Sequence, residues 1–416
     1  MKRRWLALAA VLAFALAALA VAAYLYERHR TGSVYHPHAR FVPEAPPPLP
    51  PRGPDRSAWP LYGYNKEHTR FFPGSGRLQP PFTQRWVHYG GALLEFPPVL
   101  FGDRLFQLSD DGVLHAIDRH DGHLLWSRRL GVLSASSPAV SGGSVFATVM
   151  SRAPHQAGSV FALSADTGAI RWSRPLPSQS ESSPLLDHGK LFFGSQNGTV
   201  YALDAHDGHV LWIYRAAGSV KASPTLKNGA LYFGDYSGQV QAISEQTGRR
   251  LWRSGSEGAL LGSGTFYSTP AVVYGRVFLG NTDGRVYAYD AQSGRLDWAY
   301  QTGAYVYSSP AVANAPGLGP TIYLGSYDGR FYALDARSGH VDWSYNAHGR
   351  ISGSPTIVGR IVYFADLGTR STTGLGISTG RVVFHMGTGS FDPVITDGRN
   401  IYLSGYTGLF ALSPRH

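Results

Sequence analysis

GTVYALDAHDGHVLW, residues 198–212, is the stretch that decides the fold of this chain. Its first half, TVYALD, alternates with a period of two and is rich in residues that favour strands. Asp204 then begins a tight turn that Gly208 completes, because an Asp side chain can bond the backbone beyond it and Gly accepts a positive φ. The returning segment ends in the large aromatic Trp212. The stretch therefore predicts a β-hairpin with a heavy aromatic at its far end.

The same unit recurs along the chain at a nearly constant interval. Further copies end at Trp126, Trp172, Trp252, Trp298 and Trp343, a degraded copy ends at Phe384, and Trp86 stands alone before the first. Successive marks lie 40 to 46 residues apart. A period of forty-odd residues made of strands is typical of four-stranded β-propeller blades.

The number of blades follows from a second repeating feature. A proline precedes a short apolar run in every period, at Pro98, Pro138, Pro184, Pro224, Pro270, Pro310, Pro355 and Pro393. These runs predict eight innermost strands, with only three strands after the last proline. We therefore expect an all-β, eight-bladed propeller over residues 58–416, closed by the strand around Trp86, which would remove the open sheet edges.

The N-terminus reads as a membrane anchor followed by a spacer. Lys2, Arg3 and Arg4 precede an uncharged run, residues 5–26, long enough to cross a bilayer as a helix. The charge before this run predicts a cytoplasmic stub and transmembrane signal anchor over residues 1–27, with the rest exported from the cell membrane. A cleaved signal peptide is the alternative. Residues 28–57 are rich in proline and predict an extended linker.

Composition excludes several classes of function. The formal net charge is +10, but it is spread thinly outside the N-terminus, so no basic patch for nucleic acid is expected. The chain has no Cys, which excludes disulfides, thiol catalysis and a lipidated cysteine. His120–His123 and His206–His209 both read His-Asp-Gly-His, but neither turn has an evident third ligand. No metal site is therefore predicted.

The position three residues before each proline is the most informative for binding. Charged or aromatic side chains occupy it in five periods, as Glu95, Glu181, Lys221, Tyr267 and Tyr307. Because all precede innermost strands, they should meet at one mouth of the central channel. We predict a partner or small polar ligand there. The alternative is that polar groups merely line a solvated channel.

The segment before the first repeat carries a family resemblance. Residues 59–86 read WPLYGYNKEHTRFFPGSGRLQPPFTQRW, and the repeats are close to the motif Ala-x-Asp-x-x-Thr-Gly-x-x-x-Trp. The matching positions of the opening are Trp59, Pro60, Tyr62, Gly63, Arg70 and Trp86. This pattern resembles the pyrroloquinoline-quinone-repeat propellers, which include quinoprotein dehydrogenases and an outer-membrane assembly lipoprotein. The resemblance implies eight blades over about residues 58–414.

The resemblance leaves two functions open. Family dehydrogenases use a catalytic Asp, calcium ligands and often a Cys pair, whereas this chain lacks Cys, a convincing Asp segment and long insertions. We therefore expect an anchored scaffold with no catalysis and no cofactor. The alternative is a dehydrogenase of alcohols or sugars that uses the quinone with calcium, and Glu95 matches a Glu at the pocket mouth of those enzymes. Without a lipidated Cys, the chain also departs from the assembly lipoprotein.

Overall fold

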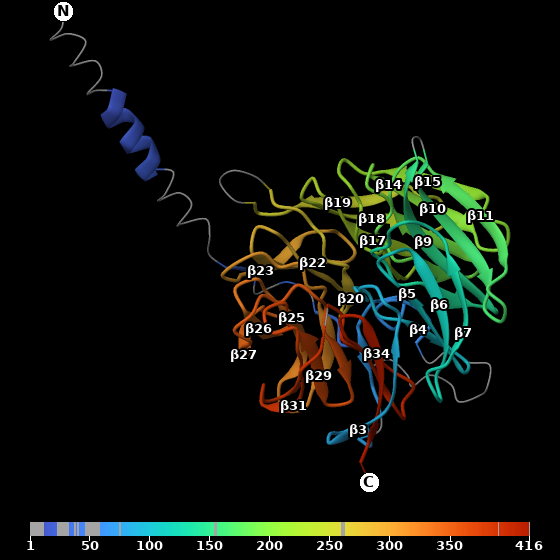
Figure 1. Cartoon of the computed structure of the whole chain (residues 1–416). Helices are drawn as coiled ribbons and strands as arrows, with labels where there is room; N and C mark the ends of the chain where they lie inside the picture. The colour runs from blue at the N-terminus through green and yellow to red at the C-terminus, as the bar shows by residue number, and fades with distance from the viewer. Residues whose placement is uncertain are drawn as a thin grey trace, which may run out of the picture.

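The computed structural model describes residues 12–22, 33–36, 39, 41–45, 59–74, 76–153, 156–258, 263–389 and 391–415. Within them, eight blades of four antiparallel strands each surround a central axis, as the resemblance and the repeats predicted (Figure 1). Each blade runs from an inner strand to an outer one. The first four blades are β4 (Val99–Phe101), β5 (Arg104–Leu108), β6 (Val113–Asp118) and β7 (Leu124–Arg129); β8 (Ala139–Ser141), β9 (Ser144–Ala153), β10 (Gln156–Ser164) and β11 (Ile170–Leu176); β12 (Leu185–Asp187), β13 (Lys190–Gly194), β14 (Thr199–Asp204) and β15 (Val210–Arg215); β16 (Thr225–Lys227), β17 (Ala230–Gly234), β18 (Gln239–Ser244) and β19 (Arg250–Gly255).

The second half of the propeller repeats this plan. Its blades are β20 (Ala271–Val273), β21 (Arg276–Gly280), β22 (Arg285–Asp290) and β23 (Leu296–Gln301); β24 (Ala311–Ala315), β25 (Gly319–Gly325), β26 (Arg330–Asp335) and β27 (Val341–Asn346); β28 (Thr356–Val358), β29 (Ile361–Ala365), β30 (Thr372–Gly376) and β31 (Val382–Met386); β32 (Val394–Thr396), β33 (Ile401–Ser404) and β34 (Gly408–Pro414) with β3 (Phe82–Tyr89). The apolar core lies between neighbouring sheets, where residues such as Val286, Ile322 and Leu334 are fully buried.

The N-terminal strand closes the ring as predicted. β3 pairs antiparallel with β34, with Trp86 opposite Ala411, and completes the eighth blade. The first and last parts of the propeller are thereby held in one sheet, so neither end leaves an open edge there.

Each repeated tryptophan reaches the next blade. Trp298 is fully buried, and its Nε1 donates a 3.1 Å hydrogen bond to the carbonyl of Ala336. Gly339, with a φ of +71°, lies so close that an added Cβ would stand 2.6 Å from the Trp298 ring.

 The same pairing joins the tryptophans and turn glycines of the other blades, at Trp86 and Gly122, Trp126 and Gly168, Trp172 and Gly208, Trp212 and Gly248, Trp252 and Gly294, and Trp343 and Gly380. The repeated Gly and Trp thus form a contact between blades.

A segment before β3 lines the central channel. This ring segment, residues 59–72, accepts backbone hydrogen bonds from the innermost strands of six blades and ends in β2 (Phe71–Phe72), which pairs parallel with β28. The donors are the N–H groups of Leu100, Val140, Leu226, Val272, Val312 and Ile357. Burial and the nearby Arg70 lower the pKa of His68 in this segment to about 3. The ring segment closes the channel on one side of the pocket described below.

Parts of the proline-rich linker lie against the propeller. β1 (Val34–Tyr35) adds to the outer edge of β23, and Phe41 stacks on Tyr274 with 5.2 Å between ring centroids. Glu44 forms an ion pair with Lys227. Over these residues the linker lies against the propeller, because its apolar side chains find partners on the fifth blade.

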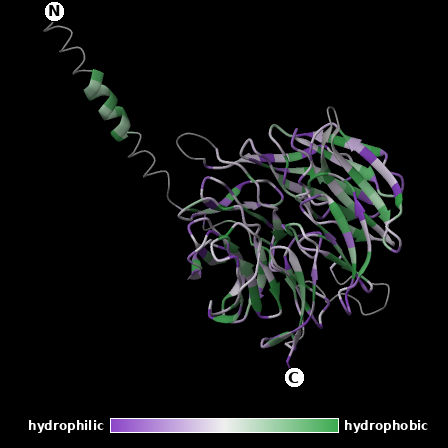
Figure 2. Ribbon diagram, in the orientation of Figure 1, coloured by the Kyte–Doolittle hydropathy of each residue, from purple (hydrophilic) through white to green (hydrophobic). Residues whose placement is uncertain are grey.

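The predicted transmembrane helix is not supported by the structure. Residues 12–22 are helical and exposed, and their colour in Figure 2 marks them as largely apolar. Among the described residues, however, no helix is long and apolar enough to cross a membrane. The remainder of the predicted span, residues 5–11 and 23–26, lies outside the described residues.

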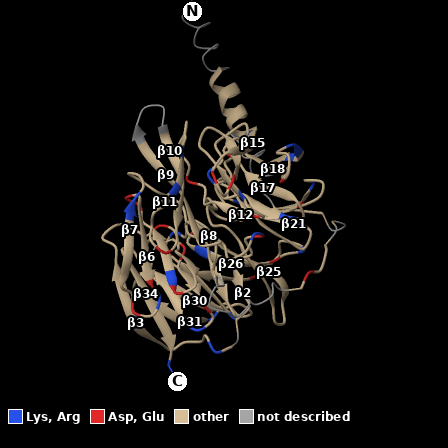
Figure 3. Cartoon of the chain, turned by 90° about the vertical axis from the view of Figure 1, so that its right-hand side faces the viewer, with Lys and Arg blue, Asp and Glu red and all other residues tan. Residues whose placement is uncertain are grey.

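Charged side chains follow the turns and strand ends of the propeller. In the view of Figure 3, Lys and Arg are interspersed with Asp and Glu rather than gathered into one patch. This distribution agrees with the thin spread of charge that the sequence indicates.

Candidate functional site

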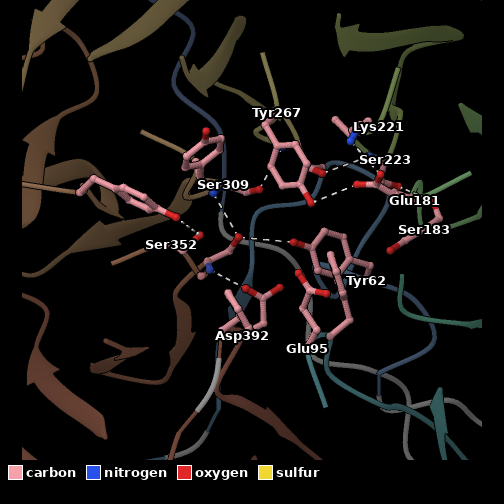
Figure 4. Close-up of a pocket in the computed structure, with 18 residues that line it drawn as sticks. Tyr62, Glu95, Glu181, Ser183, Lys221, Ser223, Tyr267, Ser309, Ser352 and Asp392 are labelled. Atoms are coloured by element: carbon pink, nitrogen blue, oxygen red, sulfur yellow. Dashed lines mark hydrogen bonds and ion pairs between the residues drawn. The ribbon is translucent and has the colours of Figure 1, made fainter. Parts of the chain in front are cut away.

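A cavity of about 270 Å³ lies in the central channel, at the end where the innermost strands begin. We call it the channel pocket. Its wall comes from the segments that enter the innermost strands of several blades, and its floor includes Tyr62 of the ring segment (Figure 4). Its volume is near the lower limit of ligand pockets, which are commonly about 300–1,000 Å³.

All five residues predicted from their offset to proline line this pocket. They are Glu95, Glu181, Lys221, Tyr267 and Tyr307. Ser352, at the same offset in the seventh blade, also lines it, whereas Ser390 of the eighth blade lies outside the described residues. This position predicts pocket residues because every innermost strand enters the channel in the same way, so the third residue before each proline reaches the same end of the channel.

Glu181 and Lys221 form an ion pair on one wall. Lys221 Nζ lies 2.8 Å from Glu181 Oε1 and 5.1 Å from the centroid of the Tyr236 ring. Gln196 Nε2 donates a 2.5 Å hydrogen bond to the same carboxylate oxygen, and the Tyr267 hydroxyl donates one of 3.5 Å to the other. The ring contact is made by Tyr236, a residue that the offset to proline does not single out.

Glu95 is the carboxyl group of the pocket without a counter-charge. The Glu95 side chain forms no hydrogen bond and no ion pair with any other residue that the structure describes. Burial raises the pKa of Glu95 to about 7, and the negative charges of Asp110 and Glu181 add to this shift. The group therefore titrates near neutral pH.

Tyrosines form the part of the wall next to the ion pair of Glu181. The rings of Tyr267 and Tyr307 meet edge to face with centroids 5.5 Å apart, and Tyr307 meets Tyr327 in the same way at 5.0 Å. Tyr305, more than half exposed at 53%, lies 6.2 Å from Tyr307 and continues the row outwards. Burial, followed by the charge of Glu181, raises the pKa of Tyr267 well above its usual range, so this hydroxyl stays protonated.

The floor of the pocket holds a buried charge pair. Arg70 Nη1 lies 3.7 Å from Asp392 Oδ2, and the Arg70 guanidinium lies 4.1 Å from the centroid of the Tyr62 ring. Asp392 is only 4% exposed, and its Oδ2 has no hydrogen-bond partner in the described structure. Burial raises the pKa of Asp392 above its usual range, although Arg70 opposes the shift. Sequence reasoning missed Asp392 and Tyr62 as pocket residues.

Asp392 could have been found from the residue directly before each proline. The residues at this position form a belt around the channel. In this belt, the backbone N–H of the residue in one blade donates a hydrogen bond to the side-chain oxygen of the corresponding residue in the next blade. The belt bonds run from Ser137 to Ser183, Ser223 to Thr269, Thr269 to Ser309, Ser309 to Ser354, and Ser354 to Asp392. Asp392 is the only carboxylate among these side chains, and this departure from a hydroxyl is visible in the sequence.

One exposed turn brings together groups that could hold an ion. Asp204, Asp207 and His209 lie within ligand distance of one another, so the expectation that this turn lacks a third group was wrong. Asp204 belongs to the strand before the turn. Its Oδ1 accepts the N–H of His206, and Asp207 Oδ1 accepts the N–H of His209. These bonds already account for the arrangement as a hydrogen-bonded turn.

The residues of the channel pocket do not fit the quinone cofactor of the family. That cofactor carries three carboxylates and is held with calcium. Here the lining carboxylates are Glu95, Glu181 and Asp392, and the lining ammonium, Lys221, is already paired. Within the described residues, the one group of three or more potential metal ligands is the exposed turn, away from this pocket. Because the described residues form no such group at the pocket to hold calcium, a tricarboxylate would meet net repulsion there.

Comparisons with known proteins agree with the fold. No curated protein matches the chain in sequence. The solved BamB from Moraxella catarrhalis superposes with a TM-score of 0.64 at 18% identity, covering 80% of this chain and 99% of that one. A europium-containing methanol dehydrogenase gives 0.70 at 15% identity, covering 86% and 91%. The quinohemoprotein alcohol dehydrogenase ADHIIG from Pseudomonas putida HK5 gives 0.72 at 13% identity, covering 85% and 80%.

Similarity at these identities establishes the fold and not the activity. The match to a family model is more specific. The model described as outer membrane protein assembly factor BamB matches residues 77–153, 147–258 and 216–415. Together these ranges cover nearly the whole propeller, and the protein belongs to this BamB family of quinone-repeat β-propellers.

Proposed function

We propose that this protein is a binding propeller without catalysis of its own, and that its partner docks on the face that carries the channel pocket. The observation that carries the proposal is the convergence of carboxylates and tyrosines in one concave site, with Glu95 left unpaired. A few polar groups aimed into a cavity with aromatic walls are typical of binding sites. The similarity to BamB, a protein named for assembly at the outer membrane, supports a role in protein binding.

We further propose that the propeller is held outside the cytoplasm by its N-terminus. The support is the uncharged run of residues 5–26 after three basic residues, together with the exposed apolar side chains of Leu12, Phe14 and Leu16. Exposed side chains of this kind need an apolar environment, which a bilayer supplies.

The second candidate is a quinone-dependent dehydrogenase. Two observations favour it, the likeness of the fold to two dehydrogenases and the position of Glu95 at the pocket. When bound, the quinone would accept electrons from an alcohol or sugar. The charges of the lining residues oppose this candidate, and we place it second.

The proposal is tested by co-purification from detergent-solubilised membranes. The variant is Lys221→Ala with Tyr267→Ala, and the matched control is Arg249→Ala with Tyr35→Ala, a cation and an aromatic away from the pocket. We expect a partner that is retained by the parent and the control and lost from the pocket variant, while all three proteins melt alike. A partner lost only from the control would place the docking surface elsewhere and contradict the proposal.

A further inference from the structure

Three carboxylates, which only accept hydrogen bonds when ionised, line the channel pocket. Glu95 has no partner of its own in the described structure, and Asp392 Oδ2 is buried without a hydrogen-bond donor. Glu181 adds a third carboxylate, already shared by Lys221 and Gln196. A ligand that satisfied this set would have to bring N–H donors, and a positive charge would offset the unpaired Glu95.

The cations near the pocket are already engaged. Lys221 is held by Glu181, and Arg70 is 2% exposed, paired with Asp392 and covered by the Tyr62 ring. With each of these cations set against one carboxylate, Glu95 leaves the pocket with one uncompensated negative charge. The charge balance therefore favours a monocation over a neutral or anionic ligand.

The tyrosine wall suits the same ligand. Tyr267, Tyr307 and Tyr327 present rings at centroid distances of 5.0 and 5.5 Å from one another. Tyrosine rings attract cations through their faces, and the protein already uses this contact where Lys221 lies over Tyr236. The rings would also cover an apolar stem. The volume of about 270 Å³ matches one long side chain or a small molecule.

From these three features we infer that the channel pocket binds an ammonium or guanidinium group on a short apolar stem. In this arrangement the cationic head lies at Glu95 and Asp392, and the stem lies against Tyr267 and Tyr307. The inference rests on the proposed function, since it names the chemistry that the pocket recognises. The cation is supplied either by a Lys or Arg side chain of the docking partner or by a free small amine.

The direct test is a calorimetric titration of the full chain in detergent. The probes are N-acetyl-lysine methylamide and n-butylamine, with N-acetyl-norleucine methylamide as the neutral control of similar shape. We expect both ammonium probes to bind and the neutral probe to bind at least about tenfold more weakly. Equal binding of the lysine and norleucine probes would overturn the inference.

Two variants locate the bound cation. Glu95→Gln removes the unpaired charge and should weaken the ammonium probes about tenfold or more. Glu67→Gln is the matched control, because Glu67 is a partly buried glutamate that lines a different cavity at the opposite mouth. An unchanged affinity in Glu95→Gln, or an equal loss in both variants, would contradict the assignment.

The pH dependence provides a second readout. Asp110, Glu181, Asp392 and Tyr267 face Glu95, and Lys221 lies beside them. Because Glu95 ionises near pH 7, affinity for the ammonium probes should rise several-fold between pH 6 and pH 8 in the parent. The rise should be absent in Glu95→Gln. The same rise in both proteins would rule out Glu95 as the group that holds the cation.

A competition experiment distinguishes a cation of the docking partner from a free amine. It also distinguishes failure of the cation site from failure of the proposed docking surface. Displacement of the co-purified partner by the lysine probe assigns the cation to that partner, and binding of n-butylamine without displacement assigns a free amine. If the pocket variant loses the partner but no ammonium probe binds, the inference fails while the proposed function stands. If the probes bind and the pocket variant keeps its partner, the docking surface fails while the cation site stands.

Discussion

Glu95 couples the pocket to the stability of the fold. Its pKa is raised from 4.5 to about 7, so the native protein binds this proton more tightly than the unfolded chain does. The stability that follows is fully present below pH 4.5 and is lost as the pH rises through 7. Above neutral pH the propeller therefore bears the cost of an unpaired carboxylate in a partly buried, negatively charged site.

Replacing Glu95 with Gln should relieve this cost. We expect the variant to be more stable than the parent by about 1–2 kcal/mol at pH 8, after allowance for solvent screening, and equal to it at pH 4.5. Chemical denaturation of both proteins at the two pH values measures the difference. A difference of the same size at both pH values would show that the effect is not the ionisation of Glu95.

At the scale of elements, the hairpin and its tryptophan are the units that join the blades. The turn glycine needs a positive φ and also leaves room for the tryptophan of the preceding blade, as Gly339 does for Trp298. The sequence revealed the hairpin and its period. It did not reveal that the tryptophan contacts the next blade, because that contact joins residues about forty positions apart.

Gly339→Ala should destabilise the propeller more than a comparable change in open space. Both Gly339→Ala and the control Gly317→Ala place a Cβ on a residue with positive φ, but nothing lies within 4 Å of the added atom at Gly317. We expect both to lose about 1 kcal/mol from the backbone and Gly339→Ala to lose about 1–3 kcal/mol more by overpacking. Equal losses in denaturation experiments would show that the Trp298 contact is not tight.

Closure by the N-terminal segments predicts unequal effects of two deletions. Removing residues 58–89 takes away the ring segment and β3, which leaves β34 unpaired on one side. Removing residues 31–57 takes away β1 and the Glu44 contact and leaves the ring intact. We expect the first deletion to lower the melting temperature by more than about 10 °C and the second by only a few degrees. Equal melting temperatures would contradict the closure argument.

For the whole molecule, the features that could be predicted from the sequence are those that recur in every blade. Eight prolines and the tryptophan marks predicted the blades and their closure, and one offset from those prolines predicted five residues of the pocket. The ring segment has no repeat, and its bonds run through backbone carbonyls that any sequence offers. Tyr62 therefore could not be placed at the floor of the pocket without the three-dimensional structure, whereas Asp392 stands out in the sequence as a carboxylate directly before a proline.

We propose that this propeller binds a partner at an acidic and aromatic pocket and does not use the quinone cofactor. The direct measurement is equilibrium dialysis of the full chain against the quinone with calcium, followed by dye-linked oxidation of alcohols and sugars. We predict no retention of quinone and no dye reduction above background, because the pocket opposes a tricarboxylate. Stoichiometric retention with quinone-dependent dye reduction, abolished in Glu95→Gln and preserved in Glu67→Gln, would contradict the account.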